Sequence, residues 1–258
     1  GCVKITPAHD LNDYEVGIKH NLEMINIMNA DSSISDKAPE KYRGMSREAA
    51  RKQIVLDLKD INHLIKEEDY FHKVGYSERG NVPIEYYLSE QWFLKMEDLA
   101  KPASKAVKDN EINFYPNHWV KTYNHWMDNI QDWCISRQLY WGHQIPVWYK
   151  KGADRSNQDN WFVSTTPPTD LENWEQDNDV LDTWFSSWLW PFAVHGWPDI
   201  KTTKYFPTNA LVTGPDIIFF WVARMIMSGY EFMGDLPFKD VYFTSILRDE
   251  KGLSLIHI

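Results

Sequence analysis

Cysteine is scarce in this sequence, because its 258 residues include only Cys2 and Cys134. These two residues stand far apart and form no Cys-x-x-Cys pair, so neither a disulfide framework nor a cysteine zinc site is expected. Small secreted domains commonly carry such a framework. The cysteine pattern therefore favours a cytoplasmic protein.

Long apolar runs are also missing. No stretch reaches the roughly 18–20 apolar residues of a membrane span, and the longest run, 217–227, is interrupted by Arg224. The sequence contains neither a P-loop nor a Gly-x-Gly-x-x-Gly motif, the commonest phosphate-binding signatures. It begins without methionine or a signal-like leader, so we expect an upstream segment to be missing.

Positive charge is in deficit, because 27 Lys and Arg face 37 Asp and Glu and the net charge is −10. This balance argues against indiscriminate binding of nucleic acid, although a local basic groove can still hold RNA. Aromatic residues are plentiful instead: 13 Trp and 13 Tyr suggest stacking surfaces or bulky core packing. The hydrophobic share of 43% and the charged share of 25% are ordinary for a soluble globular protein.

The first part of the chain reads as a polar loop over 29–46 followed by an amphipathic helix over 46–64. Ser46 stands at the position of an N-cap for this helix. The following residues are extended in character and are punctuated by two glycines and Pro83. This punctuation predicts a domain boundary near residue 85.

The second part of the chain alternates helices with short strands. The pattern predicts helices over 96–110 and 118–130, a buried strand over 209–214, a helix over 216–229 and a strand over 238–247. Strand, helix, strand is typical of a parallel α/β sheet, in which ligands bind at the carboxyl ends of the strands. This rule marks a candidate site at Thr213, Gly214, Pro215 and Asp216.

Residues 3–17 gather polar side chains at a predicted strand-to-helix corner. The first residues alternate like a strand, Pro7 breaks the ladder, and an aspartate or a neighbour can cap a short helix. Two interpretations stay open: the carboxylates cap the helix, which is their commoner role, or they form a pocket for an ammonium group. The candidate pocket residues are Lys4, Thr6, His9, Asp10 and Asp13.

The segment 132–149 is dense in Trp, Arg, Gln and His. It forms either a rim of packed aromatic rings, with Arg137 satisfied by a carboxylate, or the border of a binding cleft. A metal site is disfavoured because His143 has no partner at ligand spacing. Cys134 is an unfavourable nucleophile because nothing near it in the sequence marks a base.

Two tryptophans farther along, Trp184 and Trp221, can clamp a small apolar group, although core packing is the simpler role for each. Asp182 and Asp216 stand at predicted strand ends. There they either cap the helices that follow or bind an amine or a hydroxyl group.

Six segments in this order resemble the valyl-tRNA synthetases, a branch of the class I aminoacyl-tRNA synthetases. They are TPAHDLNDYEVG, LSEQWFLKM, DWCISRQLYWGHQIPVWY, DVLDTWFSS, DIIFFWVARMIM and RDEKG, and the likeness runs from about residue 2 to residue 252. Isoleucyl relatives differ at the opening corner and in the tryptophan motif. Lys4, Asp10 and the segments TWFSS and FFWVARM therefore select the valine branch.

The resemblance implies an α/β fold in two parts. Residues 86–252 would form the second half of a class I Rossmann-type catalytic domain with a parallel sheet. Residues 1–85 would form the C-terminal part of a β-rich inserted editing domain. Residues 253–258 fit neither the family nor a strand-to-loop transition, and we interpret them as a non-native tail.

The resemblance also implies valine–tRNA ligase activity, in which ATP with Mg²⁺ activates valine and the product is transferred to tRNA(Val). Threonine attached in error would be hydrolysed in the editing domain. The expected partners are tRNA(Val), valine, ATP and threonine as the editing substrate, with no membrane and a monomeric enzyme. The paired cysteines that bind zinc in some members are missing between Tyr149 and Asp179, so no zinc is expected.

The family's site residues carry over position by position. At the opening corner, Asp13 would hold the α-ammonium group of the editing substrate, and His9 would lie towards the terminal adenosine. Lys4, Thr6 and Asp10 would surround the threonine side chain. In the synthetic site the resemblance implies a valine pocket formed by Trp184, Ile217 and Trp221. The bordering cleft, without individual roles, would include Arg137, Gln138, Trp141, His143, Asp182 and Asp216.

This sequence departs from the family in three places. The His-Ile-Gly-His signature would precede residue 1, and the Lys-Met-Ser-Lys-Ser loop would follow RDEKG, where this chain reads LSLIHI. Because both signatures bind ATP, the chain by itself is expected not to activate valine, and its editing domain is expected to begin partway through. Pro215 stands where the family often has tyrosine, which alters the edge of the pocket.

Two other interpretations remain. A synthetase for isoleucine or another branched-chain amino acid would share most of these motifs and differ in specificity. An unrelated tryptophan-rich binding module, for example for sugars, would show aromatic stripes without a parallel α/β core. The strand–helix–strand pattern over 209–247 argues against the second of these.

Overall fold

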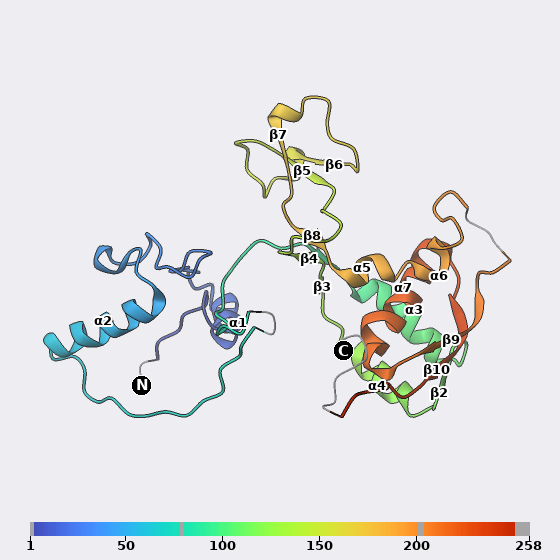
Figure 1. Ribbon diagram of the computed structural model, residues 1–258, viewed down its shortest axis with the longest axis horizontal. Helices are drawn as coiled ribbons and strands as arrows, with labels where there is room; N and C mark the ends of the chain where they lie inside the picture. The colour runs from blue at the N-terminus through green and yellow to red at the C-terminus, as the bar shows by residue number, and fades with distance from the viewer. Residues whose placement is uncertain (1–2, 78–79, 201–203, 251–258) are drawn as a thin grey trace. The chain divides into compact units, whose positions relative to one another are not determined.

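The computed structural model describes residues 3–77, 80–200 and 204–250 (Figure 1). The chain divides into two compact units, Gly1–Glu90 and Gln91–Ile258. The boundary predicted near residue 85 lies shortly before this division. The predicted tail, 253–258, lies outside the described residues.

In the first unit, α1 spans Leu11–His20 and begins at a side-chain cap. Asp10 adopts an extended backbone conformation, and its carboxylate accepts a hydrogen bond from the Asp13 N–H. At the other end, Asn21 takes a left-handed conformation with φ 49°, which lets its N–H reach the last carbonyls of the helix. Capping is therefore a real role of Asp10.

The second helix of this unit, α2, spans Arg47–Asp60, and the Ser46 hydroxyl accepts a hydrogen bond from the Ala49 N–H at 3.2 Å. The predicted helix with Ser46 as its N-cap is confirmed, although it ends at Asp60 instead of residue 64. Only Ala50 of this helix is buried. It packs into a small core with Ile34 and Ala38.

The β-rich character expected of the first unit is not found in its described residues. They pair as isolated bridges, such as Met28 with Ile34 and Ser33 with Ser46, and form no ladder of two or more residues. The strand predicted at the start of the chain is likewise wrong for the part that the structure describes, since Val3 is 81% exposed. A strand needs a hydrogen-bonded neighbour, and no described segment of this unit supplies one.

The second unit contains a three-stranded parallel sheet in the order β2–β10–β9. The strands are β2 (Asn113–Tyr115), β9 (Thr208–Thr213) and β10 (Phe238–Phe243). The helices are α3 (Glu97–Lys108), α4 (Trp119–Asp128), α5 (Thr183–Ser187), α6 (Trp190–Ala193) and α7 (Arg224–Ser228). The predicted parallel α/β architecture is confirmed (Figure 1).

The core of this unit lies where α3, α4 and α7 meet the sheet. Val222, Ile226 and Val241 are essentially inaccessible to solvent and belong to one cluster with the buried alanines of α3. Pro102 lies inside α3, but the helix continues through it because its alanines pack against α7. Tertiary burial thus outweighs the local cost of the proline.

The strand predicted over 209–214 exists, but it is not a buried strand. It is β9, an outer strand of the described sheet, and its Val212 side chain is 62% exposed. The apolar run in the sequence reflects strand propensity, whereas burial depends on which elements cover the sheet.

The chain after β9 is helical, as predicted, but it is not one regular α-helix. A 3₁₀ turn (Pro215–Ile217) leads into a π-helical segment (Ile218–Ala223), then α7, then a second π-helical segment (Gly229–Met233). At the end of α7, the Ser228 hydroxyl donates to the Trp188 carbonyl at 2.6 Å and also lies 3.1 Å from the Met225 carbonyl. The turns of a π-helix are wider than those of an α-helix, and π-helical segments occur frequently at functional sites.

Short antiparallel pairings complete the second unit. β1 (Phe93–Leu94) pairs with β3 (Trp133–Cys134), and β4 (Ser136–Arg137) pairs with β8 (Val180–Leu181). A separate sheet has the order β6–β5–β7, formed by β5 (Val147–Lys150), β6 (Trp161–Val163) and β7 (Trp174–Gln176). The Asp177 carboxylate fixes this sheet by accepting hydrogen bonds from Trp92 and Tyr149.

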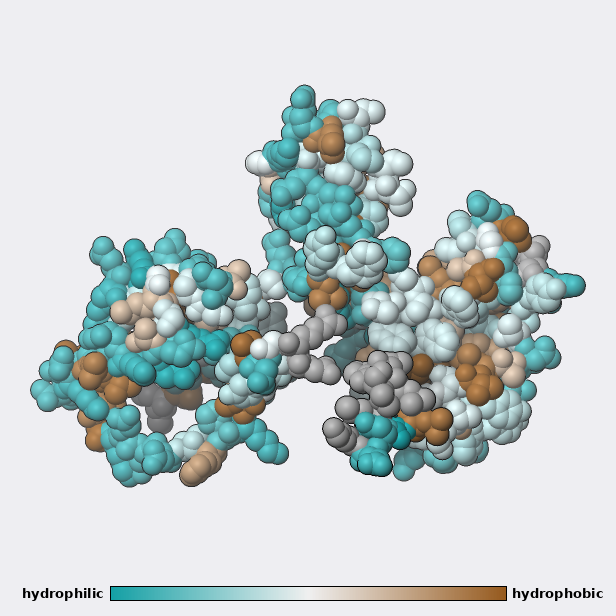
Figure 2. All heavy atoms as spheres, viewed as in Figure 1, coloured by the Kyte–Doolittle hydropathy of each residue, from teal (hydrophilic) through white to brown (hydrophobic). Residues whose placement is uncertain are grey.

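No helix within the described ranges is long and apolar enough to cross a bilayer. On the face shown in Figure 2, the hydrophobic residues form several separate spots among hydrophilic and intermediate ones.

Alkaline pH tests the contact between Tyr230 and Glu111. The Tyr230 hydroxyl donates to Glu111 Oε2 at 3.3 Å, and burial, reinforced by the charge of Glu111, raises the pKa of Tyr230 to about 12. Because the folded state holds this proton more tightly than the unfolded chain, the free energy of unfolding falls as pH rises from about 10 to about 12.

Tyr230→Phe should therefore flatten this fall in urea unfolding measured at several pH values. Tyr140→Phe, at a fully exposed tyrosine of the same unit, should leave the pH dependence unchanged. An unaltered slope in the Tyr230→Phe protein would contradict the assignment.

Candidate functional site

The opening corner of the first unit joins four of the five predicted pocket residues by hydrogen bonds. Asp13 Oδ2 accepts from the Thr6 N–H at 2.8 Å and from the Thr6 hydroxyl at 3.2 Å. Lys4 Nζ donates to the same hydroxyl at 3.1 Å, and Asp10 Oδ1 accepts from the Asp13 N–H at 2.9 Å. The corner is thus a connected polar cluster built on the first turn of α1.

Close backbone packing holds this corner against α1. A side chain added at Gly17 would place its Cβ 2.7 Å from Pro7 Cβ, so only glycine allows the helix to lie this near. Among the described residues, Asp13 Oδ1 accepts no hydrogen bond, because both bonds from Thr6 go to Oδ2. One carboxylate oxygen of the cluster is therefore available to a ligand.

His9 holds three segments of the first unit together. Its Nδ1 lies 3.0 Å from the Tyr86 carbonyl oxygen, and its Nε2 accepts from the Ile27 N–H at 3.0 Å. Because a carbonyl only accepts, the contact of Nδ1 with Tyr86 needs a proton on Nδ1. Both ring nitrogens therefore contact the backbone of other segments of this unit. The predicted position of His9 towards an adenosine stays a prediction.

A cavity of about 190 Å³ opens beside this corner. It is lined by Pro7, Ala8, Asp10, Leu11, Tyr14, Tyr86, Tyr87 and Leu88. Asp10 therefore both caps α1 and borders a cavity, so the two interpretations of the corner are compatible. Tyr86 and Tyr87 were missed from the sequence, where they stand in an extended stretch far from the corner.

In the second unit, the site residues gather around Asp182. This carboxylate is buried, and its Oδ2 accepts from Trp133 Nε1 at 2.9 Å. Arg224 Nη1 lies 3.5 Å from Oδ2, and Arg137 Nη2 lies 3.3 Å from Oδ1. Asp182 precedes α5, but its side chain makes no capping bond. It serves as the shared partner of two guanidinium groups.

Arg224 is the most deeply buried charge of this group, with a side chain only 5% exposed. Its guanidinium carbon lies 3.5 Å from the ring centroid of Trp133. Burial lowers the pKa of Arg224 to about 10; the Asp182 charge opposes this change and the Arg137 charge adds to it. Arg224 and Trp133 were missed as site residues, although an arginine inside an apolar helical run is a recognisable signal.

A cavity of about 340 Å³ opens at this cluster. Asp182, Arg137 and Arg224 line it together with Trp184 and other aromatic rings. The cavity thus combines charged groups on one part of its wall with flat apolar surfaces on another. Such a combination suits a small ligand that has a polar and an apolar end.

The residues predicted to form the valine pocket lie on neighbouring helical segments. Trp184 stacks on Phe220, with ring centroids 6.0 Å apart. Trp221 Nε1 donates to the Ser187 carbonyl at 3.0 Å, which ties the first π-helical segment to α5. Ile217 precedes that segment and is half-buried.

The remaining predicted cleft residues lie in other places. Gln138 donates to Gln91 and Asp179. Trp141 is 88% exposed, and the backbone of His143 is bonded to β8 through Leu181. Asp216 follows β9 and pairs with Arg248 at 3.1 Å. Of the six cleft residues, the structure therefore brings Asp182 and Arg137 into one cavity.

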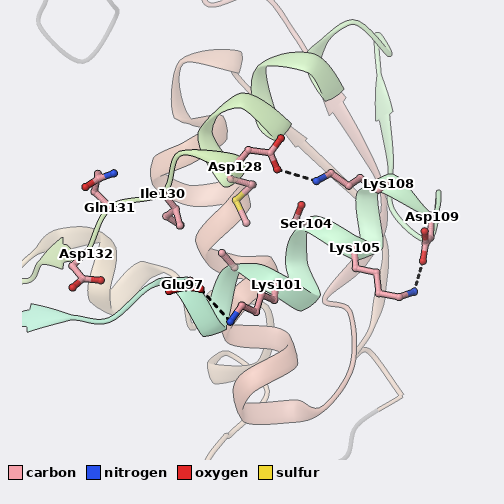
Figure 3. Close-up of a pocket in the computed structure, with 12 residues that line it drawn as sticks. Glu97, Lys101, Ser104, Lys105, Lys108, Asp109, Asp128, Ile130, Gln131 and Asp132 are labelled. Atoms are coloured by element: carbon pink, nitrogen blue, oxygen red, sulfur yellow. Dashed lines mark hydrogen bonds and ion pairs between the residues drawn. The ribbon is translucent and has the colours of Figure 1, made fainter.

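A groove of about 830 Å³ lies between α3 and α4 of the second unit (Figure 3). It contains none of the predicted site residues. Its three lysines are paired separately: Lys101 with Glu97 and Asp98, Lys105 with Asp109, and Lys108 with Asp128. Within the described ranges, no three His, Cys, Asp or Glu side chains gather as a metal site.

Asp182→Asn tests how strongly the second unit depends on its buried carboxylate. The substitution leaves two guanidinium groups without a counter-charge, so the free energy of unfolding should fall by about 3 kcal/mol. Asp216→Asn, which removes an exposed ion pair, should cost less than about 1 kcal/mol. Urea unfolding compares the two variants, and equal losses would contradict the central role of Asp182.

A model of class I tRNA synthetases (I, L, M and V) matches residues 7–255. The chain is 54% identical over 264 residues to valine–tRNA ligase of Chlorobaculum tepidum, covering 99% of this chain and 28% of that protein. Valine–tRNA ligase of Bacillus subtilis is 54% identical over 256 residues, with 98% and 28% covered.

Methionyl-tRNA synthetase of Mycobacterium tuberculosis bound by methionyl-adenylate aligns with a TM-score of 0.46 at 17% identity. That alignment covers 71% of this chain and 32% of the other. The chain spans 28% of the length of the valine–tRNA ligases that it matches. Because the family model extends over residues 7–255, the chain belongs to the class I tRNA synthetases (I, L, M and V).

Proposed function

We propose that this chain is part of a valine–tRNA ligase, which activates valine with ATP and transfers it to tRNA(Val). The observation that carries the proposal is the 54% identity to valine–tRNA ligases over 98–99% of the chain. The partners are then tRNA(Val), valine and ATP. A monomeric enzyme in the cytoplasm stays a prediction from the sequence.

The proposed valine pocket uses Trp184, Ile217 and Trp221. Hydrogen bonding of the Trp221 indole to Ser187 leaves its ring faces for apolar contact, and the stacking of Trp184 on Phe220 fixes a second flat wall. Fixed aromatic surfaces of this kind favour contact with a small apolar side chain. ATP with Mg²⁺ is a substrate of the proposed reaction, and we assign no described residue to the ion because no acidic cluster gathers for it.

We also propose that the opening corner belongs to an editing site for threonine. A hydrophobic pocket cannot strongly reject an isostere that adds only a hydroxyl group, and valine against threonine is the standard example of this limit. A second site must therefore bind threonine in preference to valine, through hydrogen bonds to the threonine hydroxyl. The Thr6 hydroxyl, the Lys4 ammonium and the Asp10 carboxylate provide suitable groups near the start of α1.

In this proposal, Asp13 holds the α-ammonium group of the threonyl ester through Oδ1, while Oδ2 keeps its bonds to Thr6. No described side chain of the corner is an activated nucleophile. The site therefore works by orienting the ester and a water molecule, which reduces the entropic cost of reaching the transition state.

Trp184→Ala tests the valine pocket in a full-length ligase that carries this segment. Loss of one aromatic wall should raise KM for valine about tenfold or more, measured by valine-dependent ATP–pyrophosphate exchange. Trp190→Ala, at an exposed tryptophan of α6, is the matched control and should leave KM unchanged. Faster exchange with isoleucine than with valine would assign the chain to another branch of the family.

Asp13→Asn tests the editing site in the same full-length ligase. Asparagine keeps an acceptor for Thr6 but removes the charge, so hydrolysis of threonyl-tRNA(Val) should slow by about tenfold or more while valine activation is retained. Asp31→Asn, in an exposed loop of the same unit, should leave hydrolysis unchanged. Undiminished hydrolysis in the Asp13→Asn enzyme would contradict the editing-site proposal and leave helix capping as the role of the corner.

A further inference from the structure

The first unit, Gly1–Glu90, buries little apolar surface. Among its described residues, Ile34 is the one large hydrophobic side chain that is buried, and the other buried hydrophobic residues are Ala8, Ala38 and Ala50. Larger apolar side chains lie exposed along α1, α2 and the segment 82–88. Small domains depend on burying such side chains, and contiguous exposed ones mark interaction surfaces.

The exposed apolar side chains of α1 lie on one face of the helix. Leu11, Tyr14 and Ile18 follow each other at spacings of three and four residues, which places them on the same side of an α-helix. Leu11 is 59% exposed and Ile18 is 61% exposed, so most of this apolar surface meets water. We call these three residues the α1 face.

A cavity of about 190 Å³ opens beside the α1 face, and Leu11 and Tyr14 line it. The segment 86–88 supplies two tyrosines and a leucine to the same cavity, and Asp10 is the one charged residue among the described residues that line it. Pockets for separate small molecules usually measure about 300–1,000 Å³. This smaller, mainly apolar cavity therefore suits a single side chain of a polypeptide better than a free ligand.

The α1 face is separate from the carboxylate of the proposed editing corner. At about 100° per residue, Asp13 lies about 100–160° around the helix from the three residues of the α1 face. The Asp13 carboxylate accepts its hydrogen bonds from Thr6. Substitutions at Ile18 therefore leave the hydrogen-bonded groups of the corner in place.

Another part of the same full-length protein is the partner that fits this surface best. The chain spans 28% of the length of the valine–tRNA ligases that it matches, so most of such a protein lies outside it. A segment of the same polypeptide is present at high effective concentration, which favours its docking over that of a free partner. A second copy fits less well, because the net charge of −10 makes copies repel each other.

We propose that the α1 face is a docking surface for a segment of the full-length ligase outside this chain, which inserts an apolar side chain into the cavity between α1 and residues 86–88. The inference rests on the proposed function, because it needs the chain to be part of a longer ligase. It goes beyond that function by giving Leu11, Tyr14 and Ile18 a partner.

Hydrogen–deuterium exchange of the α1 amides, followed by mass spectrometry, compares the 258-residue chain with a full-length ligase that carries this segment. The α1 amides should exchange about tenfold or more slowly in the full-length protein, because a covered helix opens less often. Equal exchange in the two proteins would overturn the proposal. Exchange that slows in the 258-residue chain as its concentration rises would also overturn it, because the face would then bind a second copy.

Ile18→Ser should abolish the extra protection in the full-length ligase, but should change exchange little in the 258-residue chain, where Ile18 is exposed. Lys19→Ser is the matched control, because it places the same residue in the same turn of α1 on another side of the helix, and it should keep the protection. Equal protection in the two full-length variants would contradict the docking surface.

Valine-dependent ATP–pyrophosphate exchange, measured on the same full-length proteins, separates the two proposals. Both variants should activate valine, which also shows that they fold. Loss of valine activation in the unsubstituted ligase would contradict the proposed function. Retained activation without extra protection of α1 would contradict only the docking surface.

Discussion

The second unit is organised around one buried carboxylate. Asp182 joins the segment carrying Trp133, the strand carrying Arg137 and the helix carrying Arg224. Removing a charge from water costs several kcal/mol, and the cost is offset only if bonded partners remain in place. The positions of α5 and α7 are therefore coupled, and so are those of Trp184 and Trp221, which lie on α5 and just before α7.

This dependence explains why the cluster around Asp182 could be predicted only in part from the sequence. The motif around Trp184 and the strand–helix–strand pattern are local, and the parallel sheet with its helices follows from them. The convergence of Trp133 and Arg224 on Asp182 joins residues 49 and 42 positions apart, and no periodicity encodes it. The exposure of β9 could not be predicted from local sequence either, because it depends on the place of this strand in the sheet.

At the opening corner, the sequence predicted a cluster of polar side chains at a helix start, but it did not decide between a capping role and a binding role. The N-cap at Asp10 follows from residue type and position, whereas the use of both His9 nitrogens depends on Ile27 and Tyr86, which are distant in sequence. Capping bonds hold the first turn of α1, and the remaining oxygen of Asp13 faces no described donor. A rigid helix start is a suitable support for a binding group, so the capping role is compatible with the proposed ligand-binding role of this corner.

The outer position of β9 has a consequence for the chain in solution. Among the described strands it pairs on one side only, with β10, and the exposed side chains of Val212 and Tyr242 lie on these two strands. An open strand edge is a template for pairing with another copy. The net charge of −10 keeps copies apart at low ionic strength, and added salt screens that repulsion. Colloidal stability of the isolated 258-residue chain should accordingly decline with rising salt, through contacts at this edge.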